Sequence, residues 1–325
     1  MGKKGSSRPD RVVRAQGCLL GQLAGDALGS LVEFCRPEEI RRRYPDGVRD
    51  LAAGGTWGTL AGQPTDDSEL ALLLARMLVA EGRYEAAAAF EAYRYWLHSD
   101  PFDCGATIAS ALRGRPNPDS QANGALMRVS PLGIFGAAHP RKVVAAWAHA
   151  DAALTHPHPV CGQTNALFAA AIAHAVQTGS EPASLYAHIR EWAIGDRVDE
   201  VLVAVIDRAA WAPPEDYLTL QGWVLVAFGN ALWQLLHAPS LEQALVDTVG
   251  RGGDTDTNAA VCGALLGAVH GAHAVPARWV EHLVACRPAA GQAGVRRPRP
   301  ECFWPVDAPD LAVRLVAGGV DRAQG

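Results

Sequence analysis

The chain has 325 residues, of which 49% are hydrophobic and only 19% are charged, and its formal net charge is −5 at pH 7. The apolar content excludes an intrinsically disordered chain, and the length allows a large buried core. The slight acidic excess argues against a general nucleic-acid-binding protein, which would carry a basic surplus.

Alanine-rich amphipathic segments follow one another along most of the chain. Apolar residues recur in them at helical spacing, whereas β-branched runs of alternating polarity are nearly absent. The expected helices span residues 11–31, 68–81, 85–98, 107–112, 141–152, 163–177, 185–193, 198–209, 222–236, 241–249, 257–270 and 277–284. Because no fixed repeat and no linker interrupts this series, we expect an all-α fold, a single compact multi-helix domain.

The two ends of the chain differ in composition from this helical region. We expect residues 1–10 to form a flexible basic tail, residues 11–286 the domain that carries the function, and residues 287–325 a Pro/Arg-rich C-terminal extension. The sequence contains no secretory signal and no apolar run long enough for a membrane span. The seven cysteines form no C-x-x-C pair. We therefore expect a cytoplasmic protein that does not bind membranes and has reduced, mostly buried thiols.

Two short acidic motifs stand where helices are expected to begin. They are Thr65-Asp66-Asp67-Ser68-Glu69 and Gly252-Gly253-Asp254-Thr255-Asp256-Thr257-Asn258. Helix capping is one explanation, because an Asp or Thr at a helix start accepts hydrogen bonds from free N–H groups and complements the helix dipole. Capping requires only one such side chain, however, and each motif carries two aspartates and at least one threonine.

The acidic motifs gain a second explanation if the two helix starts converge. Four aspartates would then meet in one place, and like charges so close cannot all stay ionised without a cation. Oxygen donors without Cys or His favour a hard divalent ion, namely Mg²⁺, Mn²⁺ or Ca²⁺. Because four carboxylates suit two ions better than one, the pattern suggests a two-metal hydrolytic site.

Other acidic motifs fit this sequence less well. The D-x-D-x-T pattern of aspartyl-phosphate phosphatases requires a threonine where Asn258 stands. An EF-hand loop of twelve residues ends in glutamate, where this chain has Leu265. The DDxxD/E motif of all-α terpene synthases is interrupted at Leu70. These three assignments therefore fail on residue type.

Further motifs accompany the acidic ones, in a fixed order between residues 17 and 271. They are Gly21-x-x-x-Gly25-Asp26-Ala27-Leu28-Gly29 through Glu33, Asp103-Cys104-Gly105-Ala106-Thr107, Asn123-Gly124-Ala125-x-Met127-Arg128 and Thr155-His156-Pro157. Each motif is weak alone, but all six in this order resemble the ADP-ribosyl-acceptor hydrolases, which include the dinitrogenase reductase-activating glycohydrolases. The resemblance implies the all-α ADP-ribosylglycohydrolase fold, in agreement with the helices expected above.

The resemblance also implies cofactors, a ligand and the residues that bind them. The cofactors would be two divalent ions, Mg²⁺ or Mn²⁺, with the ligands Thr65, Asp66, Asp67, Asp254, Asp256 and Thr257. An ADP-ribosyl group would contact Gly105, Ala106, Thr107, Asn123, Gly124, Ala125, Met127 and His156. The catalytic residues would be Asp103, Glu33 and Asp67.

Some of these positions also have a purely structural explanation. Asp26 could be a buried helix carboxylate that bonds to backbone, and His156 could be an ordinary loop histidine. Arg128 could form a structural ion pair instead of contacting a phosphate, and His158 is expected to be a bystander. The sequence alone leaves these alternatives open.

The activity implied is hydrolysis of the glycosidic bond between ADP-ribose and an acceptor, a protein side chain or another ADP-ribosylated group, by a monomer that releases free ADP-ribose. The transition state of such a reaction has oxocarbenium character. Two cations can hold the vicinal ribose hydroxyls and a water in one geometry. Two alternatives stay open at this point: a Mg²⁺-dependent all-α enzyme of a prenyl or other diphosphate substrate, and a catalytically silent ADP-ribose-binding protein.

Overall fold

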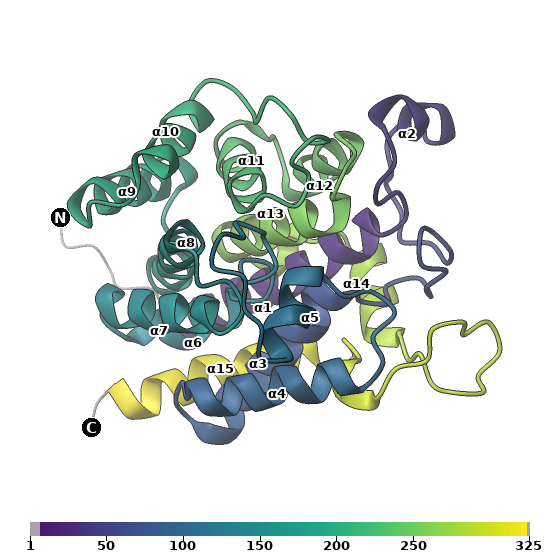
Figure 1. Cartoon of the computed structure of the whole chain (residues 1–325), viewed down its shortest axis with the longest axis horizontal. Helices are drawn as coiled ribbons and strands as arrows, with labels where there is room; N and C mark the ends of the chain where they lie inside the picture. The colour runs from purple at the N-terminus through teal and green to yellow at the C-terminus, as the bar shows by residue number, and fades with distance from the viewer. Residues whose placement is uncertain (1–6, 324–325) are drawn as a thin grey trace.

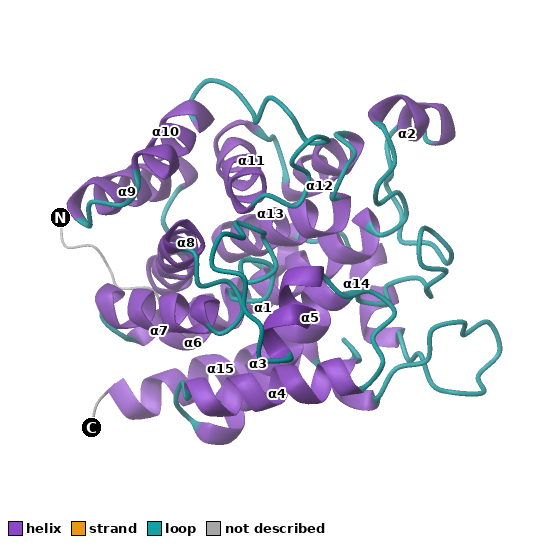
Figure 2. Ribbon diagram, viewed as in Figure 1, coloured by secondary structure: helices purple, strands orange, loops and turns teal. Residues whose placement is uncertain are grey.

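The structure, a computed structural model, describes residues 7–323, which form fifteen α-helices and three short 3-10 helices and contain no β-strand (Figures 1 and 2). The α-helices are α1 (Arg8–Gly29), α2 (Pro37–Arg43), α3 (Asp66–Glu81), α4 (Ala86–His98), α5 (Ala106–Leu112), α6 (Ser130–Phe135), α7 (Arg141–Ala153), α8 (Pro159–Thr178), α9 (Pro182–Gly195), α10 (Glu200–Ala209), α11 (Val224–His237), α12 (Leu241–Gly250), α13 (Thr255–His270), α14 (Ala277–Ala285) and α15 (Ala308–Ala323). The all-α prediction is therefore confirmed. None of the helices in this range combines the length and the apolar character needed to cross a membrane.

Helices α1 and α13 pack antiparallel in the middle of the molecule, with their backbones in contact (Figure 1). A Cβ atom at Gly21 would collide with the carbonyl oxygen of Gly263, so these positions require glycine. At the end of α1, Gly29 lies against the backbone of Asp256, and the Thr255 hydroxyl donates to the Gly29 carbonyl oxygen at 2.7 Å. This contact brings the last turn of α1 beside the first turn of α13.

Helix α3 supplies the third wall of the same region. Its apolar residues Leu70, Leu74 and Leu78 are completely buried, and the helix contacts α1, α4, α6, α13 and α15. Because α3 contacts both α1 and α13, its first turn reaches the point where those two helices meet. The acidic motif of residues 65–69 lies in this first turn.

Each helix expected from the sequence overlaps an observed helix, but α2, α6 and α15 are additional. Helices α2 and α6 have seven and six residues, too few to produce a recognisable apolar period. Helix α15 contains Gly318 and Gly319, which lower helix propensity and hide the pattern. The structure requires the second glycine, because a Cβ at Gly319 would collide with the backbone of Phe135 at the end of α6.

The chain ends are more helical than the sequence suggests. Helix α1 begins at Arg8, so residues 8–10 of the expected basic tail are helical, while residues 1–6 of that tail lie outside the described residues. Residues 287–307 are irregular except for a 3-10 helix at Glu301–Phe303. Helix α15 then packs against α1, α3 and α6, and its Leu311 and Leu315 are completely buried. The C-terminal residues thus contribute to the main hydrophobic core.

Candidate functional site

Carboxylates from several segments converge where α1, α3 and α13 meet. Carboxylate oxygens of Asp26, Asp67 and Asp256 lie within 4.8 Å of one another, and so do those of Glu33, Asp103 and Asp256. Asp256 belongs to both groups, which makes one continuous acidic cluster. The two helix starts that carry the acidic motifs therefore do come together.

Asp26 holds the start of α3 in place. Its carboxylate accepts hydrogen bonds from the backbone N–H groups of Thr65, at 3.1 Å, and Ser68, at 3.1 Å. The Thr65 hydroxyl lies 2.9 Å from Asp26 Oδ1 and 3.0 Å from Asp67 Oδ2. A side chain of α1 thus satisfies the free N–H groups at the N-terminus of α3. This is the structural role that the sequence left open for Asp26.

Two carboxylate oxygens of the cluster, Asp67 Oδ1 and Asp256 Oδ2, are buried without a hydrogen-bond partner among the described residues. A buried carboxylate oxygen that lacks a partner is costly, because its lost hydration is not replaced. The neighbouring donors are carboxylate and hydroxyl oxygens, which are the ligands that Mg²⁺, Mn²⁺ and Ca²⁺ prefer. The residues present therefore fit a divalent cation.

Burial and mutual repulsion raise the pKa values of the carboxyls in the cluster. Burial first, and then the neighbouring carboxylates, raises the pKa of Asp66 to about 7, that of Glu33 to about 8 and that of Asp103 to about 9. The same two causes hold the pKa values of Asp67 and Asp256 well above the usual range. In the absence of a cation, these groups therefore retain their protons to higher pH than ordinary carboxyls do.

The acidic cluster opens into a cavity of about 300 Å³. Of the residues predicted from the sequence, those that line it are Glu33, Asp66, Asp103, Gly105, Ala106, Thr107, Asn123, Gly124, Met127, His156, Asp254, Asp256 and Thr257. Thr65 and Asp67 lie in the cluster and do not line the cavity. Ala125 is completely buried and does not line the cavity either.

Hydrogen bonds connect the loops around the cavity to the acidic motifs. The backbone N–H of Gly105, at the start of α5, lies 3.4 Å from Asp66 Oδ2. The Asn123 side chain donates from Nδ2 to Asp254 Oδ2 at 2.7 Å. The loops that carry the two expected ligand-binding motifs are therefore held against the two helix starts.

His156 is positioned by a buried arginine. Arg128 pairs with Asp151 at 3.1 Å, and it also donates from Nη1 to the Thr155 hydroxyl at 2.9 Å. That hydroxyl lies 2.8 Å from His156 Nδ1, and His156 Nε2 is buried without a partner beside the cavity that the ring lines. Burial first, and then the charge of Arg128, lowers the pKa of His156 to about 3, so the ring is neutral. Arg128 thus has the structural role that was left open for it.

Comparison with known proteins assigns the chain to a family. The sequence model of the family described as ADP-ribosylglycohydrolase matches residues 7–298. The chain belongs to the ADP-ribosylglycohydrolase family. An ADP-ribosyl-[dinitrogen reductase] glycohydrolase from Rhodospirillum rubrum is 30% identical over 286 residues, which cover 83% of this chain and 90% of that relative.

Other relatives agree with this assignment. The ADP-ribosylarginine hydrolase Tri1 of Pseudomonas putida (strain GB-1) is 26% identical, over 83% of this chain and 74% of its own length. A solved structure named as an ADP-ribosylglycohydrolase-related protein complex has a TM-score of 0.78 at 26% identity, and the match covers 96% of this chain and 99% of that one. The resemblance found in the motifs is therefore confirmed, and the chain is a hydrolase of the ADP-ribosylglycohydrolase family.

The site of this family member also includes residues that the sequence does not single out. Phe34, Gln221 and Gly222 line the cavity, and the carbonyl oxygen of Gly222 accepts from the Asn123 N–H at 2.9 Å. Phe34 follows Glu33 directly, is 53% exposed and has a φ of 64°. Phe34 could have been found from the sequence, because it is adjacent to a predicted catalytic residue. Gln221 and Gly222 could not, because the loop that carries them contains no motif.

Proposed function

We propose that this chain is a divalent-metal-dependent hydrolase that cleaves the glycosidic bond between ADP-ribose and an acceptor and releases free ADP-ribose. One observation carries the proposal: within residues 7–323, Asp67 Oδ1 and Asp256 Oδ2 are buried without a hydrogen-bond partner, in an acidic cluster that opens into the cavity. Buried carboxylates with only a structural role are normally paired with donors or cations. Membership of the family indicates which bond such a site would cleave.

The proposed cofactors are two Mg²⁺ or Mn²⁺ ions, which suit the oxygen donors of the site. Their proposed ligands are Thr65, Asp66, Asp67, Asp254, Asp256 and Thr257. When bound, these ions supply positive charge that orients the ribose hydroxyls and favours attack by water. Asp26 lies outside this set, because its oxygens already accept hydrogen bonds from Thr65 and Ser68.

Glu33 and Asp103 are the proposed proton-transfer groups at the anomeric carbon. The indole N–H of Trp57 donates to Glu33 Oε2 at 2.6 Å. With cations bound nearby, the pKa of Glu33 would fall, and its free Oε1 would then accept a proton from the attacking water. Burial and the neighbouring carboxylates raise the pKa of Asp103 to about 9, so this carboxyl can hold the proton that the departing acceptor requires. Asp67 does not line the cavity, so it would contribute to catalysis as a ligand of the bound cations.

The remaining cavity residues are proposed to bind the ADP-ribosyl group. The segments of residues 105–107 and 123–127 would hold the ribose and diphosphate through backbone N–H groups, and His156 would contact the ligand through Nε2. Ala125 is completely buried, so it would support the second segment from behind. The neutral ring of His156 adds no charge to the site.

An arginine side chain is the proposed acceptor. The Pseudomonas relative is named for ADP-ribosylarginine, and the Rhodospirillum relative for ADP-ribosylated dinitrogen reductase. A guanidinium leaving group also carries a positive charge, which the carboxyls of Glu33 and Asp103 would favour. ADP-ribosylarginine in a protein is therefore the first substrate to examine.

The direct test is release of free ADP-ribose, measured by chromatography, from an ADP-ribosylated protein incubated with the purified chain and Mg²⁺ or Mn²⁺. Arginine-linked substrate should be cleaved, and chelation with EDTA should stop the reaction. Serine-linked and nucleobase-linked substrates in parallel incubations identify the linkage. Absence of release from all of them with both metals would contradict the proposal.

Two other results would replace the proposal with one of the alternatives. Calorimetric binding of ADP-ribose without any turnover would indicate a binding protein. Release of diphosphate from a prenyl diphosphate would indicate an enzyme of the second class.

A further inference from the structure

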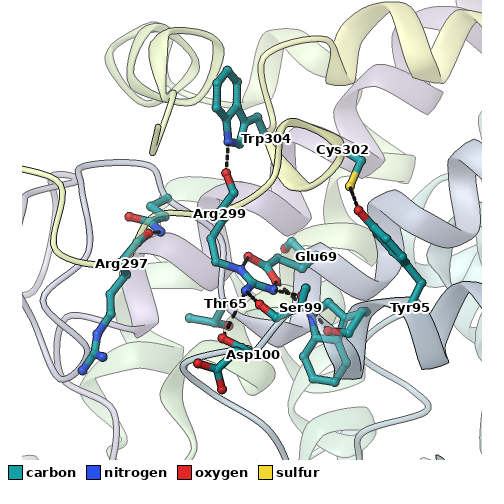
Figure 3. A network of polar contacts seen from close by, with 12 residues as sticks. Thr65, Glu69, Tyr95, Ser99, Asp100, Arg297, Arg299, Cys302 and Trp304 are labelled. Carbon is teal, nitrogen blue, oxygen red and sulfur yellow. Dashed lines mark hydrogen bonds and ion pairs between the residues drawn. The ribbon is translucent and has the colours of Figure 1, made fainter. Parts of the chain in front are cut away.

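A buried arginine lies in the segment that precedes α15. We call residues 296–307 the C-terminal strap, because they run along α3 before α15 begins. Arg299 in this strap is only 5% exposed, and it lies just beyond the part of the chain that the family's sequence model matches. Its backbone is held on both sides. The Arg299 N–H donates to the Pro288 carbonyl oxygen at 2.8 Å, and the Arg299 carbonyl oxygen accepts from the Trp304 indole at 2.8 Å (Figure 3).

The Arg299 guanidinium pairs with Glu69 in the first turn of α3. Arg299 Nε donates to Glu69 Oε1 at 2.8 Å and Nη2 donates to Glu69 Oε2 at 2.7 Å (Figure 3). The Trp96 indole donates to the same carboxylate at 2.8 Å. Both charged side chains are 2% exposed, so the pair is fully desolvated and geometrically restricted.

The other edge of the guanidinium binds the turn that follows α4. Arg299 Nη1 donates to the carbonyl oxygens of Ser99, at 2.8 Å, and Asp100, at 3.3 Å. Arg299 Nη2 also donates to Ser99 Oγ at 2.8 Å. Asp100 has a φ of 54°, a left-handed conformation that aspartate adopts more readily than most residues other than glycine. The Ser99 hydroxyl also donates to the Trp96 carbonyl oxygen at 2.6 Å, at the end of α4. Arg299 therefore adds contacts from the strap to a turn that is already bonded to α4.

These contacts form a closed ring that includes the candidate site. Asp100 is followed by Asp103, which belongs to the acidic cluster, and by Gly105, whose N–H lies 3.4 Å from Asp66 Oδ2. Asp66 and Glu69 both lie in the first turn of α3. The ring thus runs from α3 through Arg299 to the turn, along residues 101–105, and back to α3.

We propose that Arg299 is a positioning residue that fixes the segment of residues 99–105 against the first turn of α3. The planar guanidinium can donate to a carboxylate along one edge and to the turn along another. A lysine ammonium has no such planar set of donors and cannot make both sets of contacts in this geometry. The effect on conformation is independent of the activity, and the effect on catalysis rests on the function proposed above.

Arg76 provides a matched control on the same two elements. Arg76 lies in α3 and, like the pair of Glu69 with Arg299, connects this helix to the strap, through two contacts of 2.7 Å to Asp307 and one of 2.9 Å to the Cys302 carbonyl oxygen. Its remaining hydrogen bond reaches the Trp304 carbonyl oxygen at 3.3 Å, so among the described residues its contacts all lie outside residues 99–105. Loss of this anchor therefore weakens the attachment of the strap without opening the ring.

The conformational test is amide hydrogen exchange of the full chain, comparing Arg299→Lys, Arg76→Lys and the wild type. For Arg299→Lys we expect exchange in residues 100–107 to be about tenfold faster or more. The segment can then open locally without the free-energy cost of breaking the guanidinium contacts. For Arg76→Lys we expect no change in this segment. Unchanged exchange in Arg299→Lys, or an equal increase in both variants, would overturn the proposal.

Ser99→Ala is the milder variant, for use if Arg299→Lys does not fold. It removes the contact between Arg299 Nη2 and Ser99 Oγ, together with the hydrogen bond from Ser99 Oγ to the Trp96 carbonyl oxygen, and leaves the ion pair with Glu69 intact. Faster exchange confined to residues 100–107 supports the proposal. Exchange identical to the wild type in this variant contradicts it.

The functional test compares Arg299→Lys, Arg76→Lys and the wild type in kcat, in KM and in Mn²⁺ affinity, the last measured by electron paramagnetic resonance. In Arg299→Lys we expect kcat/KM to fall by about 10²-fold, because misplacing reactive groups by 1 Å has an effect of that size, while Arg76→Lys keeps the wild-type values. A wild-type protein that releases no ADP-ribose would refute the proposed function only. Exchange of residues 100–107 would still decide the role of Arg299.

Discussion

At the scale of single residues, Asp256 is the group on which the metal hypothesis depends most. It belongs to both sets of converging carboxylates, and its Oδ2 is buried without a hydrogen-bond partner among the described residues. Burial and repulsion by other carboxylates hold its pKa well above the usual range. The side chain is therefore tolerated as a neutral acid without metal, and it becomes an anionic ligand when a cation replaces the proton.

The variant Asp256→Asn replaces this carboxyl by an amide of the same shape. It should abolish metal binding and leave folding nearly unchanged. We expect the melting temperature in EDTA to change little, because a neutral acid is replaced by a neutral amide. The increase in melting temperature on adding Mn²⁺ should disappear, and activity should fall by at least about 10²-fold. Thermal unfolding with and without Mn²⁺ and an ADP-ribose release assay measure the two effects.

Asp247→Asn is the appropriate control for this experiment. Asp247 pairs with Arg251 and accepts a hydrogen bond from Gln234. It belongs to neither set of converging carboxylates, so the metal-dependent stabilisation should persist. If Asp256→Asn retained both the stabilisation by Mn²⁺ and full activity, the binuclear site would be wrong.

Asp26 makes a different prediction, because it acts through hydrogen bonds to α3. The carboxylate accepts from the N–H groups of Thr65 and Ser68, and an amide in Asp26→Asn would turn its NH₂ group toward at least one of these donors. We expect a loss of about 1–3 kcal/mol in the free energy of unfolding, the usual effect of leaving a buried polar group unsatisfied. Urea unfolding monitored by circular dichroism measures it. An unchanged free energy of unfolding would show that Asp26 does not hold the start of α3.

At the scale of the elements, the contact between α1 and α13 determines where the site forms. Backbone contact between the two helices requires glycine at Gly21 and Gly263, and it places Gly29 against Asp256. A larger side chain would push apart the two helices that carry Asp26 and Asp256. Stability and site geometry therefore depend on the same packing.

Gly21→Ala should consequently be much more harmful than an ordinary glycine substitution. Its new Cβ would collide with the Gly263 carbonyl oxygen, which belongs to a buried backbone and cannot move aside. We expect a loss of about 1–3 kcal/mol or more in the free energy of unfolding, as for overpacked cores. Gly195→Ala is the control, because a Cβ there meets open space at the end of α9 and should be neutral or slightly stabilising. Equal effects of the two substitutions in urea unfolding would contradict this account of the packing.

The sequence predicts the elements well because apolar spacing and helix starts are local properties. The sequence does not predict α15, because Gly319 in this helix is required by close packing against Phe135. Such a contact between distant residues leaves no trace in the local sequence pattern. It also cannot supply pairings between distant segments, such as Arg299 with Glu69, 230 positions apart. The glycines of α1 are visible as a motif, but their partner helix is not.

For the candidate site, the acidic motifs and the ligand-binding motifs could be recognised because they concentrate unusual residue types. The structure brings Asp67, Asp103 and Asp256 into one cluster. This convergence was expected because the three residues were predicted to contribute to the same catalytic site. The hydrogen bonds of Asp26 and the contribution of Gln221 to the cavity could not be foreseen. Both depend on how α1 and a loop without a motif pack against the rest.

At the scale of the whole molecule, part of the acidic excess of the chain is concentrated in one place. Several of its carboxylates lie inside the fold, at the junction of α1, α3 and α13. Two divalent cations would bring four positive charges to a chain whose formal net charge is −5. Stability, metal binding and pH should therefore be coupled through this one cluster.

This coupling predicts how stability depends on pH in EDTA. The folded-state pKa values are raised to about 6 for Asp26, about 7 for Asp66 and about 9 for Asp103. Above pH 4 the unfolded chain therefore releases protons that the folded chain retains, and stability should decrease as pH rises from 5 to 8. Each such carboxyl contributes about 1.4 kcal/mol per pH unit up to its own folded-state pKa, so the decrease should be steepest below pH 6 and become shallower as Asp26 and then Asp66 ionise in the folded chain. Excess Mg²⁺ or Mn²⁺ should oppose this loss, and more so at higher pH, because cations and protons compete for the same oxygens. Melting temperatures at pH 5, 6, 7 and 8, with EDTA or with metal, test both trends, and a metal-induced increase that does not grow with pH would disprove the coupling.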